Sequence, residues 1–351
     1  MNFASDNVWG VAAPIMAALE ATRLGADGAY GGDDLTSKLE ARFSEVFERD
    51  VSMYLVPTGT AANALAAAAY CPPFGTIFCH GESHLYYDEW GAAEFYTGGA
   101  KLESLAGDGG IVDPGMFSDV LDYFRSGARH RSTPSLFSLT QATEFGQVYS
   151  LDQISTLTGL AKASGLATHM DGARFANALA SLSCSPAEMT WKVGIDCLSF
   201  GATKNGVMGA EALLFLDGKA HDDMEARRMR GGLLMSKSRF LSAQLLAYLA
   251  DNLWLEMAGK ANDCAKVLGA GLARSKEARL AWPVAANEVF AILSNKQDQV
   301  FRDAGAIYNP WHATGPDRVS VVDDGEILVR MVASPETPME SVQELLALTI
   351  K

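Results

Sequence analysis

The sequence predicts an α/β protein, with a larger part built on a mostly parallel β-sheet and a smaller α+β part after it. Between residues 51 and 216, short apolar runs alternate with helix-like stretches, and repeated β-α units of this kind form parallel sheets covered on both faces. Residues 218–274 are expected to be almost entirely helical, and strand patterns return only near residue 289. Because the stretch 227–232 interrupts this helical region, we expect two domains, 1–230 and 231–351.

The positions of the apolar runs predict the individual elements. A helix is expected at 14–22, within the amino-terminal segment. In the larger part we expect strands at 52–56, 76–79, 136–140, 166–170, 195–200 and 212–216, and helices at 60–70, 114–125, 151–163 and 186–192. In the smaller part we expect strands at 289–293, 318–322 and 327–332, and a helix from residue 336.

Length and composition narrow the class of protein. The 351 residues are 48% hydrophobic and 20% charged, which is ordinary for a globular protein large enough for two domains. The formal charge of −14 argues against nucleic acid or an anionic membrane as a partner. No apolar run has membrane-spanning length and no signal-peptide pattern is present, so we expect a cytoplasmic protein. The five cysteines lack metal-ligand spacing, which favours reduced core residues and no metal site.

Lys204 is the only charged residue between Asp196 and Glu211, in a stretch of small and apolar residues. The pattern predicts a tight turn between two buried strands. Because a buried ammonium without a partner is costly, a lysine there needs a chemical reason. One reason is that its amine forms an imine with a carbonyl cofactor, since desolvation favours the reactive neutral amine. The alternative is a lysine that extends from a strand end into solvent.

Asp171 ends another apolar run and is followed by a glycine turn. Lys204 comes 33 residues later, which leaves room for a crossover helix and a parallel neighbouring strand. We therefore expect both residues at the carboxyl edge of one sheet, where open α/β folds bind ligands. Pyridoxal phosphate requires such a pair, because the lysine holds its aldehyde and the acid keeps its pyridine nitrogen protonated. A structural ion pair between the two residues is the alternative.

The stretch Pro57-Thr-Gly-Thr-Ala-Ala-Asn63 lies between an apolar run and an alanine-rich run. A strand, a turn of small residues and a strong helix former are expected in this order. The turn places backbone N–H groups and the hydroxyls of Thr58 and Thr60 at a helix N-terminus, which is a ready anion site. Many loops have a similar sequence, but beside Asp171 and Lys204 this turn is suited to the phosphate of pyridoxal phosphate.

At this point the sequence resembles a known family, the threonine aldolases of the aspartate aminotransferase fold, and most closely their low-specificity L-threonine aldolase or phenylserine aldolase branch. The resemblance extends from Phe3-Ala-Ser-Asp-Asn7 almost to the carboxyl terminus. It includes Ala29-Tyr-Gly-Gly-Asp-Asp34, Gly59-Thr-Ala-Ala-Asn63, Glu82-Ser-His-Leu85, Leu139-Thr-Gln-Ala-Thr-Glu144, His169-Met-Asp-Gly-Ala-Arg-Phe175, Phe200-Gly-Ala-Thr-Lys-Asn-Gly206 and Ser236-Lys-Ser-Arg-Phe-Leu-Ser-Ala-Gln244. It implies a mostly parallel seven-stranded sheet in the large domain and a small α+β carboxyl-terminal domain.

The resemblance also implies roles for single residues. The expected catalytic residues are Lys204, His84 and Asp171, with His84 stacked on the cofactor ring and a candidate proton acceptor. The expected cofactor-binding residues are Thr58, Gly59, Thr60, His84, Asp171, Arg174, Thr203 and Lys204. Ser5 and Arg330 are expected to hold the substrate carboxylate, and Tyr30 is expected to reach the neighbouring subunit's site. For Tyr30 the alternative is a solvated turn, and for Arg330 an exposed position on an edge strand.

Two departures from the family pattern concern the site. Glu144 stands where short-chain members have a second histidine, which leaves the identity of the base open. The segment Gly231-Gly-Leu-Leu-Met-Ser236 lacks the arginine that supports the cofactor phosphate in those members, and Lys237 or Arg230 is a candidate replacement.

By this resemblance the expected reaction is a retro-aldol cleavage of L-threonine, L-allo-threonine or phenylserine to glycine and an aldehyde, with pyridoxal phosphate as cofactor. The expected assembly is a homo-oligomer, a dimer of dimers with shared active sites. One alternative is another reaction on the same cofactor, such as β-elimination or a serine hydroxymethyltransferase-like reaction. The other is a non-catalytic protein of the same fold, which would be expected to lack Lys204, Asp171 or the Gly59-Thr60 pair.

Overall fold

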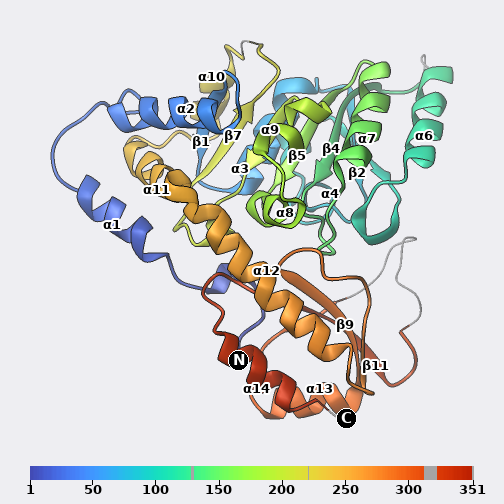
Figure 1. Cartoon of the computed structure of the whole chain (residues 1–351). Helices are drawn as coiled ribbons and strands as arrows, with labels where there is room; N and C mark the ends of the chain where they lie inside the picture. The colour runs from blue at the N-terminus through green and yellow to red at the C-terminus, as the bar shows by residue number, and fades with distance from the viewer. Residues whose placement is uncertain (128–129, 220, 312–321, 350–351) are drawn as a thin grey trace.

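The computed structural model describes residues 1–127, 130–219, 221–311 and 322–349. Within these residues the chain forms two β-sheets with helices packed against both (Figure 1). The larger sheet has seven strands in the order β1-β7-β6-β5-β4-β2-β3, and the smaller has four in the order β10-β11-β9-β8. The predicted fold class, a mostly parallel α/β sheet followed by a smaller α+β part, is confirmed.

Most strands of the larger sheet run in parallel. The strands are β1 (Ser52–Val56), β2 (Gly75–His80), β3 (Lys101–Leu105), β4 (Thr133–Thr140), β5 (Ala167–Gly172), β6 (Cys197–Phe200) and β7 (Glu211–Phe215). β3, β2, β4, β5 and β6 pair in parallel, and β7 is antiparallel to both β6 and β1. All six strands predicted for this region are present, and the crossover between Asp171 and Lys204 joins parallel neighbours as expected. Only β3 was not predicted, because this edge strand carries two charges in five residues.

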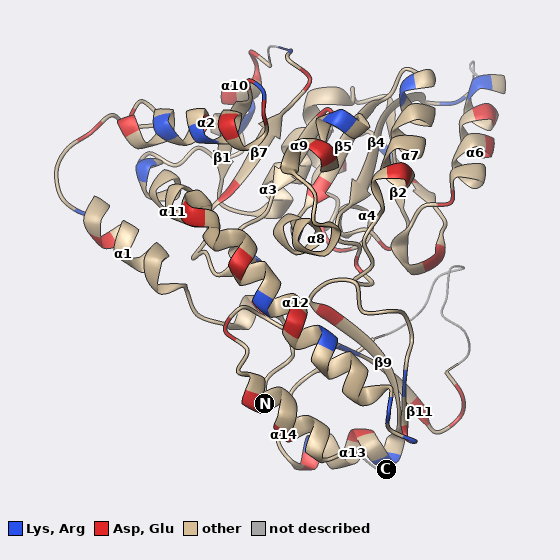
Figure 2. Cartoon of the chain, viewed as in Figure 1, with Lys and Arg blue, Asp and Glu red and all other residues tan. Residues whose placement is uncertain are grey.

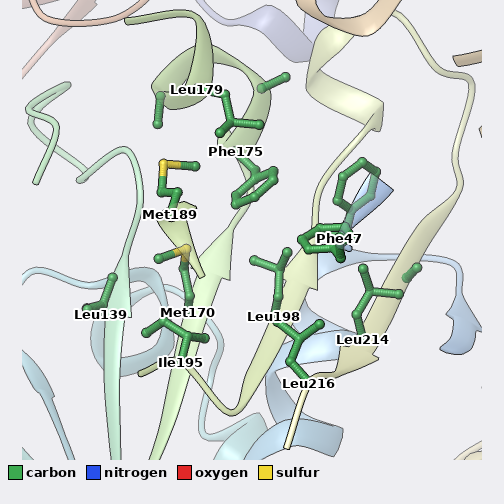
Figure 3. Close-up of a cluster of buried hydrophobic side chains, with 14 of the residues drawn as sticks. Phe47, Leu139, Met170, Phe175, Leu179, Met189, Ile195, Leu198, Leu214 and Leu216 are labelled. Atoms are coloured by element: carbon green, nitrogen blue, oxygen red, sulfur yellow. The ribbon is translucent and has the colours of Figure 1, made fainter. Parts of the chain in front are cut away.

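Helices cover both faces of this sheet. They are α3 (Gly59–Tyr70), α4 (His84–Tyr87), α5 (Ala92–Thr97), α6 (Pro114–Ser126), α7 (Leu151–Ala163), α8 (Phe175–Leu182) and α9 (Pro186–Met189). On one face, Leu198 and Leu214 pack with residues of α8 and α9 (Figure 3). On the other face, their chain neighbours Cys197 and Leu213 pack against α3, because successive strand residues point to opposite sides. Both faces of the sheet are therefore covered by apolar side chains of the helices, so a ligand can reach the sheet only at its edges.

The smaller sheet is antiparallel and has its own core. Its strands are β8 (Ala278–Leu280), β9 (Glu288–Ser294), β10 (Asn309–Pro310) and β11 (Glu326–Val332), and α12 (Leu253–Leu272), α13 (Asn295–Asp303) and α14 (Met339–Ala347) pack on it. The predicted strands at 289–293 and 327–332 are β9 and β11, and the predicted last helix is α14. The predicted strand at 318–322 falls, except for its last residue, outside the described residues.

The amino-terminal segment packs against the smaller sheet before the chain continues to the larger one. The backbone N–H of Phe3 donates to the carbonyl of Ile307, and Val332 donates to the carbonyl of Phe3. The Phe3 ring is buried in the core of the smaller sheet. A short 3-10 helix, η1 (Asp6–Val8), follows, then α1 (Ala13–Thr22) and α2 (Asp34–Val46). The segment around Ser5 is thus held at the boundary between the two sheets.

Helix α12 links the two sheets, because it packs against α8 on one side and against β9 and α14 on the other (Figure 1). Two further helices, α10 (Met224–Arg230) and α11 (Arg239–Leu249), precede it. α10 ends at the glycine pair 231–232, and the domain boundary after residue 230 stays a prediction. Acidic residues are spread over the outer helices rather than gathered in one patch (Figure 2). None of the helices in the described part is long and apolar enough to span a bilayer.

Candidate active site

The candidate site lies at one edge of the larger sheet, where several strands end together. β5 and β6 are parallel, and β1 runs in the same direction because it and β6 are both antiparallel to β7. Their carboxyl ends therefore meet at one edge, which also receives the ends of β2 and β4. Asp171, Lys204 and the turn before α3 all follow from these strand ends, as the sequence predicts.

A cavity of about 270 Å³ opens at this edge. Seven of the predicted site residues line it: Thr58, Gly59, Thr60, His84, Asp171, Thr203 and Lys204. The wall is completed mainly by Asn7, Asn63, Glu89, Glu144, Ser199 and Glu211. The structure thus brings together predicted site residues that lie up to 146 positions apart in the chain, from Thr58 to Lys204.

Lys204 lies on η4 (Thr203–Asn205), a single 3-10 turn between β6 and β7. The buried carboxylate of Glu211 accepts hydrogen bonds from the backbone N–H groups of Ala202, at 2.8 Å, and Thr203, at 3.3 Å. Burial raises the pKa of Glu211, although these hydrogen bonds oppose the rise. Glu211 therefore fixes the turn that presents the lysine to the cavity.

Gly201 allows β5 and β6 to end close together. A Cβ at this position would lie 2.6 Å from the Cα of Ala173 and 2.7 Å from two backbone carbonyl oxygens. These are backbone atoms, so they cannot move aside as the end of a flexible side chain could. Only glycine fits between the turn after Asp171 and the turn that carries Lys204.

Asp171 is buried and held by two hydrogen bonds. Its Oδ1 accepts from the backbone N–H of Ala173, at 3.0 Å, and its Oδ2 accepts from Nδ2 of Asn63, at 2.8 Å. Asn63 belongs to α3, so this hydrogen bond fixes Asp171 relative to the turn that begins α3. The carboxylate keeps a defined orientation at the cavity wall.

The first turn of α3 faces the same cavity. Thr58 caps the helix, because its side-chain oxygen accepts from the N–H of Ala61 at 3.2 Å. The other N–H groups of the first turn have no acceptors within the helix, as at any helix start. No atom lies within 4 Å of the position that a Cβ on Gly59 would take, apart from its own chain neighbours, so the space over this turn is open. An anion can be bound there by backbone N–H groups.

His84 begins α4 and lines the cavity from the other side. Its Nδ1 lies 2.8 Å from Oε1 of Glu89, whose side chain is fully buried. Glu144 accepts a hydrogen bond from the backbone N–H of His84, at 3.3 Å. The hydrogen bond to Glu89 raises the pKa of His84, and burial opposes this rise.

A second cavity, of about 480 Å³, adjoins the first and shares Asn7, His84, Glu144 and Lys204 with it. Ser5, Arg174 and Arg330 line this second cavity, together with Trp311. The guanidinium of Arg330 lies over the Trp311 ring, 4.8 Å from its centroid. The predicted substrate residues Ser5 and Arg330 thus lie beside the predicted cofactor residues, on the side formed by the smaller sheet.

A buried cluster of charges stands behind the second cavity. Arg174 donates to both carboxylate oxygens of Asp6, at 2.9 and 3.2 Å, and lies 3.3 Å from Glu288. Arg330 lies 3.9 Å from the same oxygen of Glu288. Burial raises the pKa of Glu288, although the charges of both arginines oppose this rise. Burial acts in the same direction on Asp6. There it is outweighed by Arg174, Lys204 and Asn287, which hold the pKa of Asp6 below its ordinary value. Arg174 lines the second cavity rather than the first, and its role in cofactor binding stays a prediction.

Tyr30 is the one predicted site residue that lines neither of the two cavities described above. Its side chain is 54% exposed, and its backbone N–H donates to the carbonyl of Ser236. It borders a separate pocket with Arg228 and residues of β1. Its expected contact with a neighbouring subunit stays a prediction.

Sequence reasoning missed several residues that the structure places in the walls. Glu89 and Glu288 could not be recognised from the sequence as site residues. The neighbourhood of Glu89, beside Trp90, is typical of an ordinary turn, and that of Glu288, beside Asn287, is typical of a strand end. Glu211 could have been found, since it is the acid that closes the uncharged stretch around Lys204.

The fold and the site together define a class of protein. Pyridoxal phosphate enzymes of the aspartate aminotransferase fold have a lysine and an acid at the carboxyl ends of neighbouring parallel strands, facing a helix N-terminus. The chain belongs to the beta-eliminating lyase family, whose profile matches residues 2–296.

Named relatives of the chain agree with this family. It is 38% identical to a low specificity L-threonine aldolase from a Pseudomonas species over 95% of this chain and 96% of that protein. It is 37% identical to the Pseudomonas aeruginosa low specificity L-threonine aldolase, over 98% and 95% of the two chains. Among solved structures, Leishmania major threonine aldolase matches with a TM-score of 0.89 at 26% identity, covering 99% of this chain and 98% of that one. Sphingomonas wittichii serine palmitoyltransferase, at 14% identity and a TM-score of 0.72 over 99% and 86% of the two chains, shares the fold.

Proposed function

We propose that this protein is a pyridoxal phosphate-dependent aldolase that cleaves β-hydroxy-α-amino acids to glycine and an aldehyde. L-threonine and L-allo-threonine are the proposed substrates, and phenylserine is a further one. The observation that carries the proposal is the adjacency of the two cavities, one with Lys204 and Asp171 and the other with Arg330. Relatives named as threonine aldolases over nearly the full chain support it.

The residues of the first cavity fit the cofactor in their chemistry. Lys204 offers the amine for an aldehyde, Asp171 a buried carboxylate for a ring nitrogen, and the open first turn of α3 a set of N–H groups for a phosphate. The proposed phosphate ligands are Thr58, Gly59, Thr60 and Thr203. When bound, pyridoxal phosphate supplies a ring that accepts the electron pair of the bond broken at the substrate Cα.

The second cavity would orient the substrate. Arg330 presents a planar guanidinium suited to a bidentate grip on a carboxylate, and Ser5 lies in the same wall. Trp311 packs over Arg330 and limits its movement. A carboxylate held in this way sets the direction of the Cα–Cβ bond, so these residues contribute to rate through orientation.

Two side chains are candidates for the base that takes the β-hydroxyl proton. His84 and Glu144 line both cavities, within reach of a substrate placed between Lys204 and Arg330. We assign the role of this base to His84, because its Nδ1 is bonded to Glu89 and its other ring nitrogen is available to accept the proton. Glu144 is the alternative.

The test is an assay of the purified enzyme with several amino acids. With threonine or phenylserine, the proposal expects equal amounts of glycine and of acetaldehyde or benzaldehyde. The family's name makes β-elimination the second candidate, and this reaction would give pyruvate from serine or cysteine. Pyruvate from serine without glycine from threonine would overturn the aldolase assignment.

We further propose a homotetramer in the cytoplasm, built as a dimer of dimers in which Tyr30 reaches the neighbouring site. The five cysteines are free thiols, as expected for a reducing compartment. Light scattering on the active enzyme tests the assembly.

A further inference from the structure

Four side chains form a continuous hydrogen-bonded network from one side of the first cavity to the other. Nδ1 of His84 lies 2.8 Å from Oε1 of Glu89, and Nδ2 of Asn63 donates to the same oxygen at 2.9 Å. Nδ2 of Asn63 also donates to Oδ2 of Asp171, at 2.8 Å. The network connects α4, the turn before α5, α3 and the end of β5.

Counting donors and acceptors fixes the protons in this network. An amide nitrogen carries two hydrogens, and Asn63 uses one for Glu89 and one for Asp171. With Glu89 ionised, Oε1 is an acceptor only, so the bond from His84 has its proton on Nδ1. In the neutral ring the other nitrogen, Nε2, is then an unprotonated acceptor, and it has no partner among the described residues.

Glu89 is an unusual residue to find at this place. Its side chain is fully buried, and its second oxygen, Oε2, has no hydrogen-bond partner in the described part of the chain. No lysine or arginine pairs with it in that part either. Burying a carboxylate that pairs only with a histidine is costly, and a neutral residue of similar size would fill the space without this cost. The charge therefore has a use beyond packing.

We propose that Glu89 is a positioning residue for His84: it holds the proton on Nδ1 and stabilises the imidazolium that forms when Nε2 takes the β-hydroxyl proton of the substrate. Asn63 couples this pair to Asp171, so the acid at the cofactor ring and the base at the substrate share one network. This inference rests on the proposed aldolase reaction, with His84 as its base.

The titration behaviour agrees with the geometry. The hydrogen bond that His84 donates to Glu89 raises the pKa of His84, against burial, and the charges of Glu144 and Asp171 act in the same direction as Glu89. Burial raises the pKa of Glu89 itself, and the hydrogen bonds from His84 and Asn63 oppose this. The acid limb of the pH–rate profile follows His84, because only its unprotonated ring can accept a proton. Removing the charge of Glu89 lowers the pKa of His84, so this limb moves to lower pH.

The test compares Glu89→Gln with the wild type, and uses Glu94→Gln on α5 as a matched control that removes a nearby acid outside the network. For Glu89→Gln we expect kcat to fall at least about tenfold, and by no more than the roughly 10²–10⁴-fold that a general base contributes, with KM nearly unchanged. The acid limb of kcat/KM should move to lower pH. Glu89→Asp, which keeps the charge but shortens the side chain, should retain the wild-type limb with reduced kcat. This variant also keeps the test valid if Glu89→Gln folds poorly.

A second measurement does not depend on turnover. In ¹⁵N-histidine spectra of the holoenzyme, the His84 signal is identified by its loss in His84→Asn. We expect Nδ1 to be protonated and Nε2 to be unprotonated in the wild type and in Glu94→Gln, and this tautomer to be lost in Glu89→Leu, which offers Nδ1 no acceptor. An unchanged tautomer in Glu89→Leu and an unmoved acid limb in Glu89→Gln would overturn the role of Glu89. An enzyme that makes no glycine from threonine but shows the expected spectra would overturn only the proposed reaction.

Discussion

At the scale of single residues, Lys204 is the first position to test. Lys204→Ala should abolish glycine formation, because the amine that holds the cofactor aldehyde is lost. The phosphate turn is intact in this variant, so we expect it to retain some cofactor without the visible absorption of the wild type. Borohydride should bleach the wild type irreversibly and leave the variant unaffected. Lys192→Ala, which removes an exposed lysine, is the control, and near-normal activity in Lys204→Ala would exclude the assignment.

Arg330 tests the grip on the substrate carboxylate. Arg330→Lys keeps the charge but loses the planar fork, and a bidentate contact of this kind contributes about 1.5–3 kcal/mol. We expect KM for threonine to rise about tenfold or more, and kcat to fall because the Cα–Cβ bond is held less firmly. Arg279→Lys on β8 of the same sheet, an arginine paired with Glu326 near the surface, is the matched control. Equal KM values for Arg330→Lys and the wild type would remove Arg330 from the site.

The sequence predicted the residues to which we assign the chemistry, but not the residues that hold them in place. Lys204 and Asp171 are each a charged residue beside an apolar run, and this pattern can be recognised in the sequence without knowledge of the fold. Glu89 gives no such signal, because its partners His84 and Asn63 become neighbours only after α3 and α4 pack on the sheet.

At the scale of elements, η1 is tied to the rest of the molecule by Asp6. This carboxylate joins Arg174, at the start of α8, and accepts a hydrogen bond from Asn287, before β9. At neutral pH, Asp6→Asn should cost about 3 kcal/mol, the low end for breaking a buried ion pair, because Glu288 still faces Arg174. The melting temperature reports this loss, and Asp263→Asn on the surface of α12 should leave it nearly unchanged.

The same variant has a defined pH dependence. The pKa of Asp6 in the folded chain lies below its ordinary value of 3.8, so its ionised form stabilises the fold at every pH above that value. This contribution is lost as the pH falls below 3.8 and through the lowered pKa. The difference in melting temperature between the wild type and Asp6→Asn should therefore shrink in acid. A difference that does not depend on pH would show that the charge of Asp6 is not its source.

The close approach of β5 and β6 makes a second prediction for an element. Gly201→Ala places a methyl group 2.6 Å from the Cα of Ala173, and overpacking of this kind costs about 1–3 kcal/mol. We expect the turn of Lys204 to shift and cofactor retention, measured by visible absorption, to fall. Gly209 lies in the same connection between β6 and β7 as Gly201, but no atom lies within 4 Å of the methyl that Gly209→Ala would add, so this variant should behave as the wild type. Equal cofactor retention in both variants would contradict the steric argument.

Elements with a strong local pattern were predicted, and those shaped by tertiary context were not. The strands β1, β2, β4, β5, β6 and β7 consist largely of apolar and small uncharged residues. By contrast, β3 is an edge strand that carries two charged residues among its five. Helix α2 was missed because it follows a glycine-rich turn and buries only Leu39 and Phe43 on a narrow face. The antiparallel direction of β7 follows from the short connection after β6, which is too short for a crossover helix.

At the scale of the whole molecule, the amino-terminal region has apolar surface without a partner in one chain. Helix α1 is largely apolar, but only Ile15 is buried, and Met16 and Leu24 are 46% and 72% exposed. The helix lies beside α11 at the margin of the molecule (Figure 1). Exposed apolar residues in one segment favour an interface there, and Tyr30 lies eight residues after the end of α1. These observations support the proposed oligomer.

Mixing two inactive variants tests whether sites are shared. If Tyr30 acts on a neighbouring site, a hybrid of Tyr30→Ala and Lys204→Ala chains contains one complete site, formed by Lys204 of one chain and Tyr30 of the other. After dissociation and reassembly of an equal mixture, we expect about a quarter of wild-type activity, as for random pairing in a closed dimer. No recovery, or an active monomer by light scattering, would refute the sharing. Tyr30→Ala mixed with itself is the control.

The attachment of the first residues to the smaller sheet has a consequence for synthesis on the ribosome. After Asp6 has been synthesised, 281 more residues must be added before its partner Asn287 is complete. The interval between Phe3 and its partners Ile307 and Val332 is longer still. At typical elongation speeds the first of these delays is roughly 15–60 s. During this time the cofactor half, with Asp171 and Lys204, is already made, but the wall formed by Ser5 and Arg330 does not yet exist. A nascent chain arrested before Arg330 is therefore expected to bind cofactor without cleaving amino acids, so that catalysis begins only when synthesis is nearly complete.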